Sequence, residues 1–175
     1  MGTLTYDDFV NLPDDKRYEI IDGELYLTPT PTTKHQRVLG NLSMALHHWT
    51  RAKKLGEVFF ARLDVVLSDR DIVEPDLIFV SAARMKIIVP ENIRGVPDLL
   101  GEVLTVETRN FDETVKLKRY EYFGVPEYWI VDPQTESLRI HRHNGRRYEA
   151  VDVAGTITSP LFPGFSLPLS EVFPQ

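Results

Sequence analysis

Two acidic residues beside apolar runs are the side chains of this sequence most able to do chemistry. Glu102 lies inside the apolar segment 99–104, where burying a carboxylate costs several kcal/mol unless a cation compensates the charge. Asp76 directly precedes the apolar segment 77–80. Hard divalent cations bind oxygen, typically one or two carboxylates together with water and substrate phosphate. The two residues therefore predict a magnesium or manganese site, although on the residues alone Asp76 could end a turn and Glu102 could pair with an arginine.

A lysine follows on a segment that we expect to be helical. On a helix Asp112, Lys116 and Tyr120 are four residues apart and share one face, so Lys116 could point toward the strand of Glu102. A lysine beside a metal-bound water stabilises hydroxide and the negative charge that develops on phosphorus. The alternative is a solvent-exposed pair of Asp112 and Lys116, worth about a few tenths of a kcal/mol.

The composition is that of an ordinary folded domain. The chain has 175 residues, of which 42% are hydrophobic, with 26 acidic and 20 basic side chains and a net charge of −6. This length and composition predict a single domain over residues 1–175 and exclude intrinsic disorder. Because the chain has no cysteine, disulfides, thiolate metal sites and a cysteine nucleophile are excluded.

The apolar segments are too short for a membrane span, which needs about 20 residues. Residues 1–8 show neither the basic start nor the apolar stretch of a secretory signal. We therefore expect a cytoplasmic protein with no membrane partner.

Charge is segregated along the chain. The net negative charge argues against nonspecific coating of nucleic acid, which depends on neutralising phosphates. However, residues 25–56 contain no acid, and a helix expected over 35–54 places basic residues near its ends. The candidates for contacting nucleic-acid phosphates are Lys34, Arg37, Arg51, Lys53 and Lys54. His35 is expected to be a helix-start or surface histidine, with a phosphate contact as the alternative.

The hydrophobic patterns predict a mixed α/β core with the two longer helices packed on its faces. The Asp22-Gly23 turn predicts a hairpin over 18–27 that places Glu19 within a strand. The other expected elements are a short helix opened by Thr5, helices over 35–54 and 112–123, strands over 58–60, 63–67, 77–80, 99–104 and 128–131, a short helix and irregular connection over 81–96, a second hairpin over 138–153, and a proline-rich tail draped over the body.

Two aromatic or histidine features have plain structural interpretations. Trp49 on the apolar helix face and Trp129 in an apolar strand are expected to pack in the core rather than to stack on bases. His141 and His143 alternate on one face of a strand without a nearby third ligand, which favours a surface hairpin over a metal site.

Several short segments between Thr5 and Pro133 occur together in a specific combination. They are Arg17 to Glu24, Glu74-Pro75-Asp76-Leu77, Glu102 to Thr105, Thr108-Arg109, Asp112 with Lys116 and Tyr120, and Gly124 to Pro133. Together they resemble the bacterial Uma-type family of putative restriction endonucleases, a domain of unknown function.

The resemblance implies the PD-(D/E)XK nuclease fold, a restriction endonuclease-like α/β (α+β) fold whose mixed sheet is flanked by helices, here with N-terminal and C-terminal β-hairpins. Asp76 then corresponds to the PD element and Glu102 to the second acidic element. That pattern places a lysine two residues later, where this chain has Leu104. The resemblance implies that Lys116 on the next helix replaces it, with Lys118 as the reserve candidate.

These assignments predict a nuclease that hydrolyses phosphodiester bonds with magnesium or manganese bound by Asp76 and Glu102. Glu19 matches an additional N-terminal acid that holds or orients a metal ligand. Lys116 is expected to stabilise the nucleophile or the transition state. DNA is the expected substrate, and a homodimer is expected because dimers are common among nucleases that cut both strands.

Two other classes of function stay open on the residues. One is a noncatalytic nuclease-like fold that binds nucleic acid or a protein partner, which the leucine at position 104 favours. The other is glycoside hydrolysis, which also uses two carboxylates. Against the second stands the lysine-bearing helix, because a phosphate reaction would use that charge and a neutral sugar would not need it.

Overall fold

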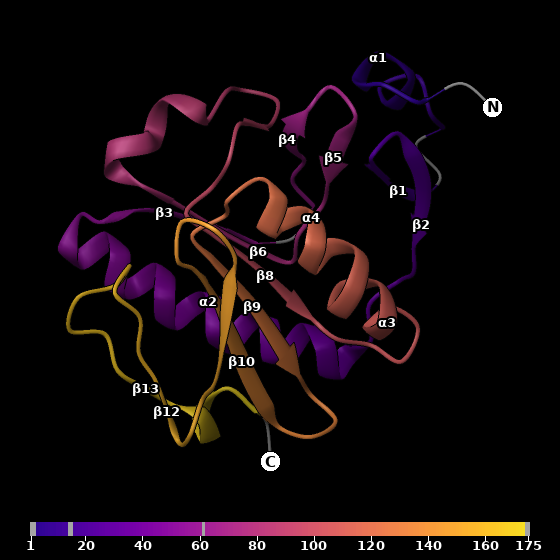
Figure 1. Cartoon of the computed structure of the whole chain (residues 1–175). Coiled ribbons are helices and arrows are strands. Elements are labelled where there is room, and N and C mark those ends of the chain that lie inside the picture. Colours follow the sequence, from indigo (N-terminus) through magenta and orange to yellow (C-terminus); the bar gives the residue numbers. More distant parts are fainter. Residues whose placement is uncertain (1–2, 14–15, 61, 174–175) are drawn as a thin grey trace.

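The computed structural model describes residues 3–13, 16–60 and 62–173, and its elements alternate between helices and short strands (Figure 1). The helical elements are α1 (Tyr6–Phe9), α2 (Thr33–Lys53), a 3₁₀ helix (Ala82–Ile87), α3 (Arg109–Phe111), a π-helical turn (Asp112–Lys116), α4 (Leu117–Tyr122) and a second 3₁₀ helix (Leu169–Glu171). The strands are β1 (Arg17–Ile21), β2 (Glu24–Thr28), β3 (Gly56–Phe60), β4 (Val65–Ser68), β5 (Asp71–Val73), β6 (Leu77–Ser81), β7 (Ile93–Arg94), β8 (Leu99–Val103), β9 (Glu127–Asp132), β10 (Ser137–His143), β11 (Tyr148–Asp152), β12 (Thr156–Ile157) and β13 (Leu167–Pro168).

A six-stranded mixed sheet in the order β11-β10-β9-β8-β6-β3 forms the centre of the molecule. Strands β8 and β9 are parallel, and the other neighbours are antiparallel. On one face, Leu42 and Leu46 of α2 pack with Phe79 and Trp129 of the sheet, and Phe162 from the tail completes this core. Alternation along a strand sends every second side chain to this face, so Trp129 is buried as the sequence predicts.

The opposite face of the sheet is covered by the continuous helical segment Arg109 to Tyr122, here called the α3–α4 segment, and by a second sheet (Figure 1). Tyr120 packs there with Leu100 and Tyr128. The second sheet has five strands in the order β2-β1-β5-β4-β7 and contributes Val65 and Val73 to the same core. A mixed sheet flanked by helices is therefore confirmed as the fold class.

The two hairpins have the predicted turns. Asp22 and Gly23 take φ angles of 53° and 78°, which an aspartate-glycine pair supplies at low cost. The second hairpin, β10 and β11, is also present, but His141 is buried against Tyr128 and Tyr148 instead of lying on the surface. The interpretation of His141 as a surface residue is wrong. Strand β10 lies between β9 and β11 inside the sheet, and His141 is buried on the face of the sheet that α4 covers.

Two boundaries differ from the sequence prediction. The strand predicted over 63–67 begins at Val65, and the turn predicted after it contains a further strand, β5. The helix predicted over 112–123 begins at Arg109 and includes the π-helical turn.

The tail crosses the α2 face of the sheet, where Phe162 and Val172 are buried, as expected for a draped segment. In the described part of the chain, no helix combines the length and apolarity that crossing a bilayer requires.

Candidate active site

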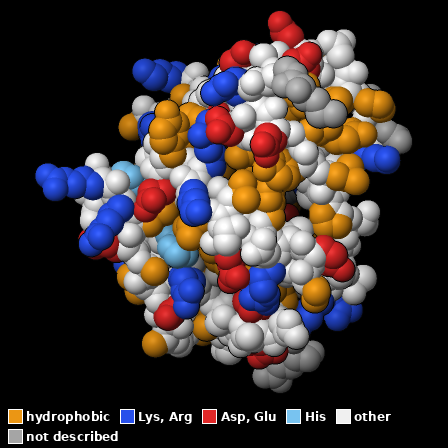
Figure 2. Space-filling model, turned by 45° about the vertical axis from the view of Figure 1, so that its right-hand side comes forward, with side chains coloured by type: hydrophobic (Ala, Val, Ile, Leu, Met, Phe, Trp, Pro, Cys, Tyr) orange, Lys and Arg blue, Asp and Glu red, His pale blue; other side chains and the backbone are white. Residues whose placement is uncertain are grey.

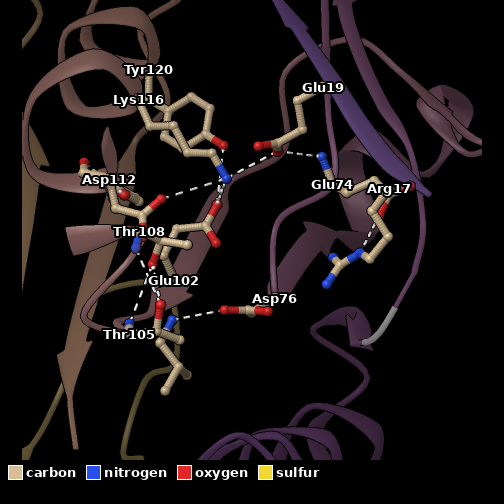
Figure 3. A network of polar contacts seen from close by, with 12 residues as sticks. Arg17, Glu19, Glu74, Asp76, Glu102, Thr105, Thr108, Asp112, Lys116 and Tyr120 are labelled. Carbon is tan, nitrogen blue, oxygen red and sulfur yellow. Dashed lines mark hydrogen bonds and ion pairs between the residues drawn. The ribbon is translucent and has the colours of Figure 1, made fainter. Parts of the chain in front are cut away.

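A cavity of about 210 Å³ opens between the β1–β2 hairpin and the α3–α4 segment. Its lining includes all four residues that the sequence analysis assigned to the reaction, which are Glu19, Asp76, Glu102 and Lys116. They come from four separate elements: β1, the entry to β6, β8 and the π-helical turn. Figure 3 shows these side chains converging from the two sides of the cavity.

Lys116 is the centre of the polar network. Its Nζ lies 2.8 Å from Oε1 of Glu102, 2.9 Å from Oε1 of Glu19 and 3.6 Å from Oδ1 of Asp112 (Figure 3). Only 3% of the Lys116 side chain is exposed. Lys116 thus reaches the strand of Glu102, and the alternative of a solvent-exposed pair with Asp112 is wrong.

The helix places this lysine through an irregular turn. Residues 112–116 form a π-helical turn between two α-helical stretches, and such turns occur frequently at functional sites. Tyr120, one turn later, places its hydroxyl 3.3 Å from the same Oε1 of Glu102. Lys116, the last residue of the irregular turn, and Tyr120, one turn beyond it, therefore both face the carboxylate on β8. Lys118, the reserve candidate, is exposed and does not line the cavity.

Burial and mutual repulsion shift the protonation of these groups. Burial raises the pKa of Glu102 well above its usual range, although the positive charge of Lys116 lowers it. The negative charge of Asp112 raises this pKa further. Burial also raises the pKa of Asp112 to about 6. Burial alone would lower the pKa of Lys116, but the surrounding carboxylates outweigh that effect and raise it. Lys116 therefore stays protonated at neutral pH, while Glu102 and Asp112 keep their protons to higher pH than ordinary carboxyl groups.

Asp76 is held by two donors at one of its oxygens. Its Oδ2 accepts a hydrogen bond from the backbone N–H of Val103 on β8, at 2.9 Å, and lies 2.9 Å from Nε2 of His35. His35 is 5% exposed and sits in the first turn of α2, whose start is capped by Thr32 at 3.2 Å. The sequence analysis missed this contact and treated His35 as a helix-start or surface residue.

Glu19 contacts the lysine from the hairpin side. Its Oε1 also accepts a hydrogen bond from the backbone N–H of Glu74, at 2.8 Å, and Glu74 in turn accepts one from Nε of Arg17, also at 2.8 Å. The sequence analysis gave no role to Arg17 or Glu74. Alternation along β1 could have placed Arg17 on the face of Glu19, and Glu74 lies two residues before Asp76.

The cavity as a whole is strongly acidic. Its lining holds two strong cations, Arg17 and Lys116, against six carboxylates, so its formal charge is −4. The six are Glu19, Glu74, Asp76, Glu102, Glu107 and Asp112. Within residues 3–13, 16–60 and 62–173, no three acidic or histidine side chains are grouped closely enough to hold a metal ion by themselves.

The basic residues predicted to contact nucleic acid are all exposed but are widely spread. Lys34 lines a groove next to the cavity, together with Arg109. Arg51 lies 17 residues further along α2, about 26 Å away at 1.5 Å per residue. Arg37, Lys53 and Lys54 do not line the cavity either. The structure thus brings only Lys34 near the cavity.

The fold and the acidic cavity define a class, that of nuclease-like α+β proteins. The fold matches the crystal structure of a putative nuclease belonging to DUF820 from Anabaena variabilis ATCC 29413, with a TM-score of 0.80, 19% sequence identity and coverage of 97% of each chain. This chain belongs to the Uma2 family, described as putative restriction endonucleases, whose family model matches residues 6–170. No curated protein sequence matches the chain.

Proposed function

We propose that the protein is a metal-dependent nuclease that hydrolyses phosphodiester bonds in DNA. The observation that carries the proposal is the buried Lys116 between Glu102 and Glu19 at the floor of a cavity that Asp76 borders. A buried, protonated lysine among excess carboxylates suits a reaction that develops negative charge on an oxygen or phosphorus. Membership in the Uma2 family supports the same reaction class.

The donor set fits magnesium or manganese. Asp76 and Glu102 each have one oxygen fixed by the protein, through Val103 and His35 for Asp76 and through Lys116 and Tyr120 for Glu102. This leaves the second oxygen of each carboxylate as a candidate ligand. Because two protein carboxylates do not complete a coordination sphere, water and substrate phosphate would supply the other ligands, as is usual for magnesium.

The excess of carboxyl groups over cations in the cavity gives the metal ion a second role. A phosphodiester is an anion, and a cavity with a formal charge of −4 repels it. A divalent cation held by Asp76 and Glu102 reduces this repulsion and, when bound, lowers the pKa of a coordinated water. Substrate entry and reaction would then depend on the same ion.

The other side chains have roles set by their contacts. Lys116 would donate hydrogen bonds to the attacking hydroxide or to the charged oxygens of the transition state, since its raised pKa keeps it protonated. Glu19 would orient Lys116 through their 2.9 Å contact. Leu104 occupies the lysine position of the superfamily pattern and is buried in the core on the α3–α4 side of the sheet. The ammonium group of Lys116 approaches Glu102 from the helical segment instead.

The test combines metal binding with cleavage. Calorimetric titration of magnesium and manganese into wild type, Asp76→Asn and Glu102→Gln should show binding only to the wild type. Plasmid and single-stranded DNA should be cut only by wild type and only with metal, and RNA serves as the comparison substrate. Metal binding that survives in both variants would overturn the assignment of the ligands. Binding without cleavage of any substrate would favour a noncatalytic nuclease-like fold.

A further inference from the structure

The walls of the cavity differ from its floor. Above the charged groups the lining is apolar and aromatic, and it includes Tyr26, Leu27, Pro29, Pro31 and Phe111. Tyr26 shares the face of Glu19 on the β1–β2 hairpin, and its ring centroid lies 4.5 Å from that of Phe111, so the two rings form one aromatic wall. Figure 2 shows hydrophobic side chains gathered on this side of the molecule, around a narrow opening.

Cations that could hold a double helix are not arranged around this opening. Both strong cations of the lining are already paired, Arg17 with Glu74 at 2.8 Å and Lys116 with Glu102. In the neighbouring groove, Arg109 pairs with Asp132 at 2.8 Å. Among the described residues, Lys34 is thus the only exposed basic side chain in that groove without an ion pair. A duplex, whose bases are stacked inside, gains affinity here mainly from phosphate contacts, and this surface offers few cations for them, whereas an unpaired base can add contacts with aromatic side chains.

The depth of the reactive groups gives a further constraint. Glu102 is 4% exposed and Lys116 is 3% exposed, so a phosphate must descend below the protein surface to reach them. In a duplex the phosphates lie on the outside of a stiff rod, and the bases are stacked inside it. An unpaired strand can instead turn a single nucleotide into a pocket and place its base against apolar side chains.

We infer that the cavity receives one unpaired nucleotide of a single-stranded nucleic acid. The phosphate lies at the acidic floor, and the base lies against the aromatic wall of Tyr26 and Phe111. This inference rests on the proposed function and narrows its substrate class from DNA in general to unpaired segments: single strands, frayed ends or bubbles.

Phe111 offers a matched test because Tyr122, on the same α3–α4 segment, is 75% exposed and does not line the cavity. We would measure fluorescence anisotropy of a labelled single strand, of the same sequence in a hairpin duplex, and of a duplex with a central bubble, all with magnesium. We expect the single strand and the bubble to bind at least tenfold more tightly than the duplex. Phe111→Ser should weaken single-strand binding by about tenfold, in line with the loss of one base contact, and Tyr122→Ser should leave it unchanged.

Cleavage of the same three substrates separates this inference from the proposed function. Preferential binding of the single strand without cleavage would overturn the nuclease and leave the unpaired-nucleotide site standing. Equal binding and equal cutting of duplex and single strand would overturn the inference and leave the nuclease. The inference also fails if Phe111→Ser and Tyr122→Ser behave alike, or if no nucleic acid binds.

Discussion

Two ion-pair clusters join the α3–α4 segment to the five-stranded sheet, and they differ in charge balance. In the first, Lys116 faces Glu102, Glu19 and Asp112. In the second, three residues further along, Arg119 donates two hydrogen bonds to the fully buried Asp71, at 2.5 and 2.8 Å. The first has one cation for three carboxylates, whereas in the second Arg119 and Arg70 face Asp71 and Asp22, so the charges balance two to two.

The pKa shifts of the buried carboxyl groups in the two clusters have opposite directions. Burial alone would raise the pKa of Asp71, but the hydrogen bonds from Arg119 and Ser68 outweigh it and lower the pKa. In the Lys116 cluster the pKa of Glu102 is raised instead. A matched pair is satisfied by its own partner and serves the fold. An unmatched cluster beside a cavity has more carboxyl groups than cations, and a divalent cation could bind these groups by displacing their protons, so charge balance distinguishes the candidate site from its structural neighbour.

The largest expected effect is on the unmatched cluster. Lys116→Met should lower the rate of phosphodiester cleavage about 100- to 1,000-fold, because it removes the only lysine among the described residues that line the cavity. The measurement is initial cleavage rate at saturating magnesium, with circular dichroism to verify folding. Lys118→Met is the matched control, since Lys118 is exposed on the same helical segment. Equal losses of cleavage rate in Lys116→Met and Lys118→Met would contradict the catalytic role of Lys116.

Breaking the matched pair should affect stability and leave the site intact. Asp71→Asn should lower the free energy of unfolding by about 3 kcal/mol, because it leaves Arg119 without its buried partner. Urea denaturation measures this, with the exposed Asp69→Asn as control. Because the pKa of Asp71 is lowered in the fold, its contribution is fully present above its ordinary pKa of about 3.9 and is lost as the pH falls through the lower folded value.

The stability difference between wild type and Asp71→Asn should therefore shrink below about pH 4. A difference that stays constant from pH 7 to pH 2.5 would contradict the assignment. Magnesium affinity should be the same in both proteins, since Asp71 does not line the cavity.

A divalent cation should sharpen the comparison by stabilising only the unmatched cluster. Magnesium at 100 times its dissociation constant should raise the unfolding free energy of wild type by about 2.7 kcal/mol. The gain should persist in Asp71→Asn and disappear in Glu102→Gln. Thermal unfolding with and without magnesium tests this, and a gain of equal size in Glu102→Gln would place the ion elsewhere.

The smallest expected effect concerns the orientation of Asp76. His35→Ala should weaken magnesium binding about tenfold, because a residue that fixes a metal-binding carboxylate typically contributes this much. His35→Gln, which can still donate a hydrogen bond, should recover part of the loss. Calorimetry measures both, with the exposed His48→Ala on the same helix as control. Unchanged affinity in His35→Ala would show that Val103 alone suffices.

The sequence predicted those parts of the site that depend on local patterns. A glutamate in an apolar strand requires a compensating charge, and the four-residue spacing of Asp112 and Lys116 predicted the helix face from which it comes. The Asp22-Gly23 turn likewise predicted the hairpin that carries Glu19. Each of these inferences needs only a few neighbouring residues.

The parts that escaped prediction depend on packing between distant segments. His35 contacts Asp76 because α2 crosses the sheet at a particular angle and offset, which no local pattern encodes. The π-helical turn has no clear signal in residues 112–116, and strand β5 has only three residues. The division into two sheets was also missed, because short strands do not reveal their partners.

The ion pair between Glu19 and Lys116 also constrains the order in which the molecule can be made. One partner is synthesised near the start of the chain, and the other follows almost a hundred positions later. The entropy of closing so long a loop must be offset by other contacts before the pair can form. Strand β8, which carries Glu102, is moreover completed on one side by β9, which begins only at Glu127. A growing chain on the ribosome therefore carries no assembled cavity before β9 has emerged, so the candidate site forms only after both of its walls have folded.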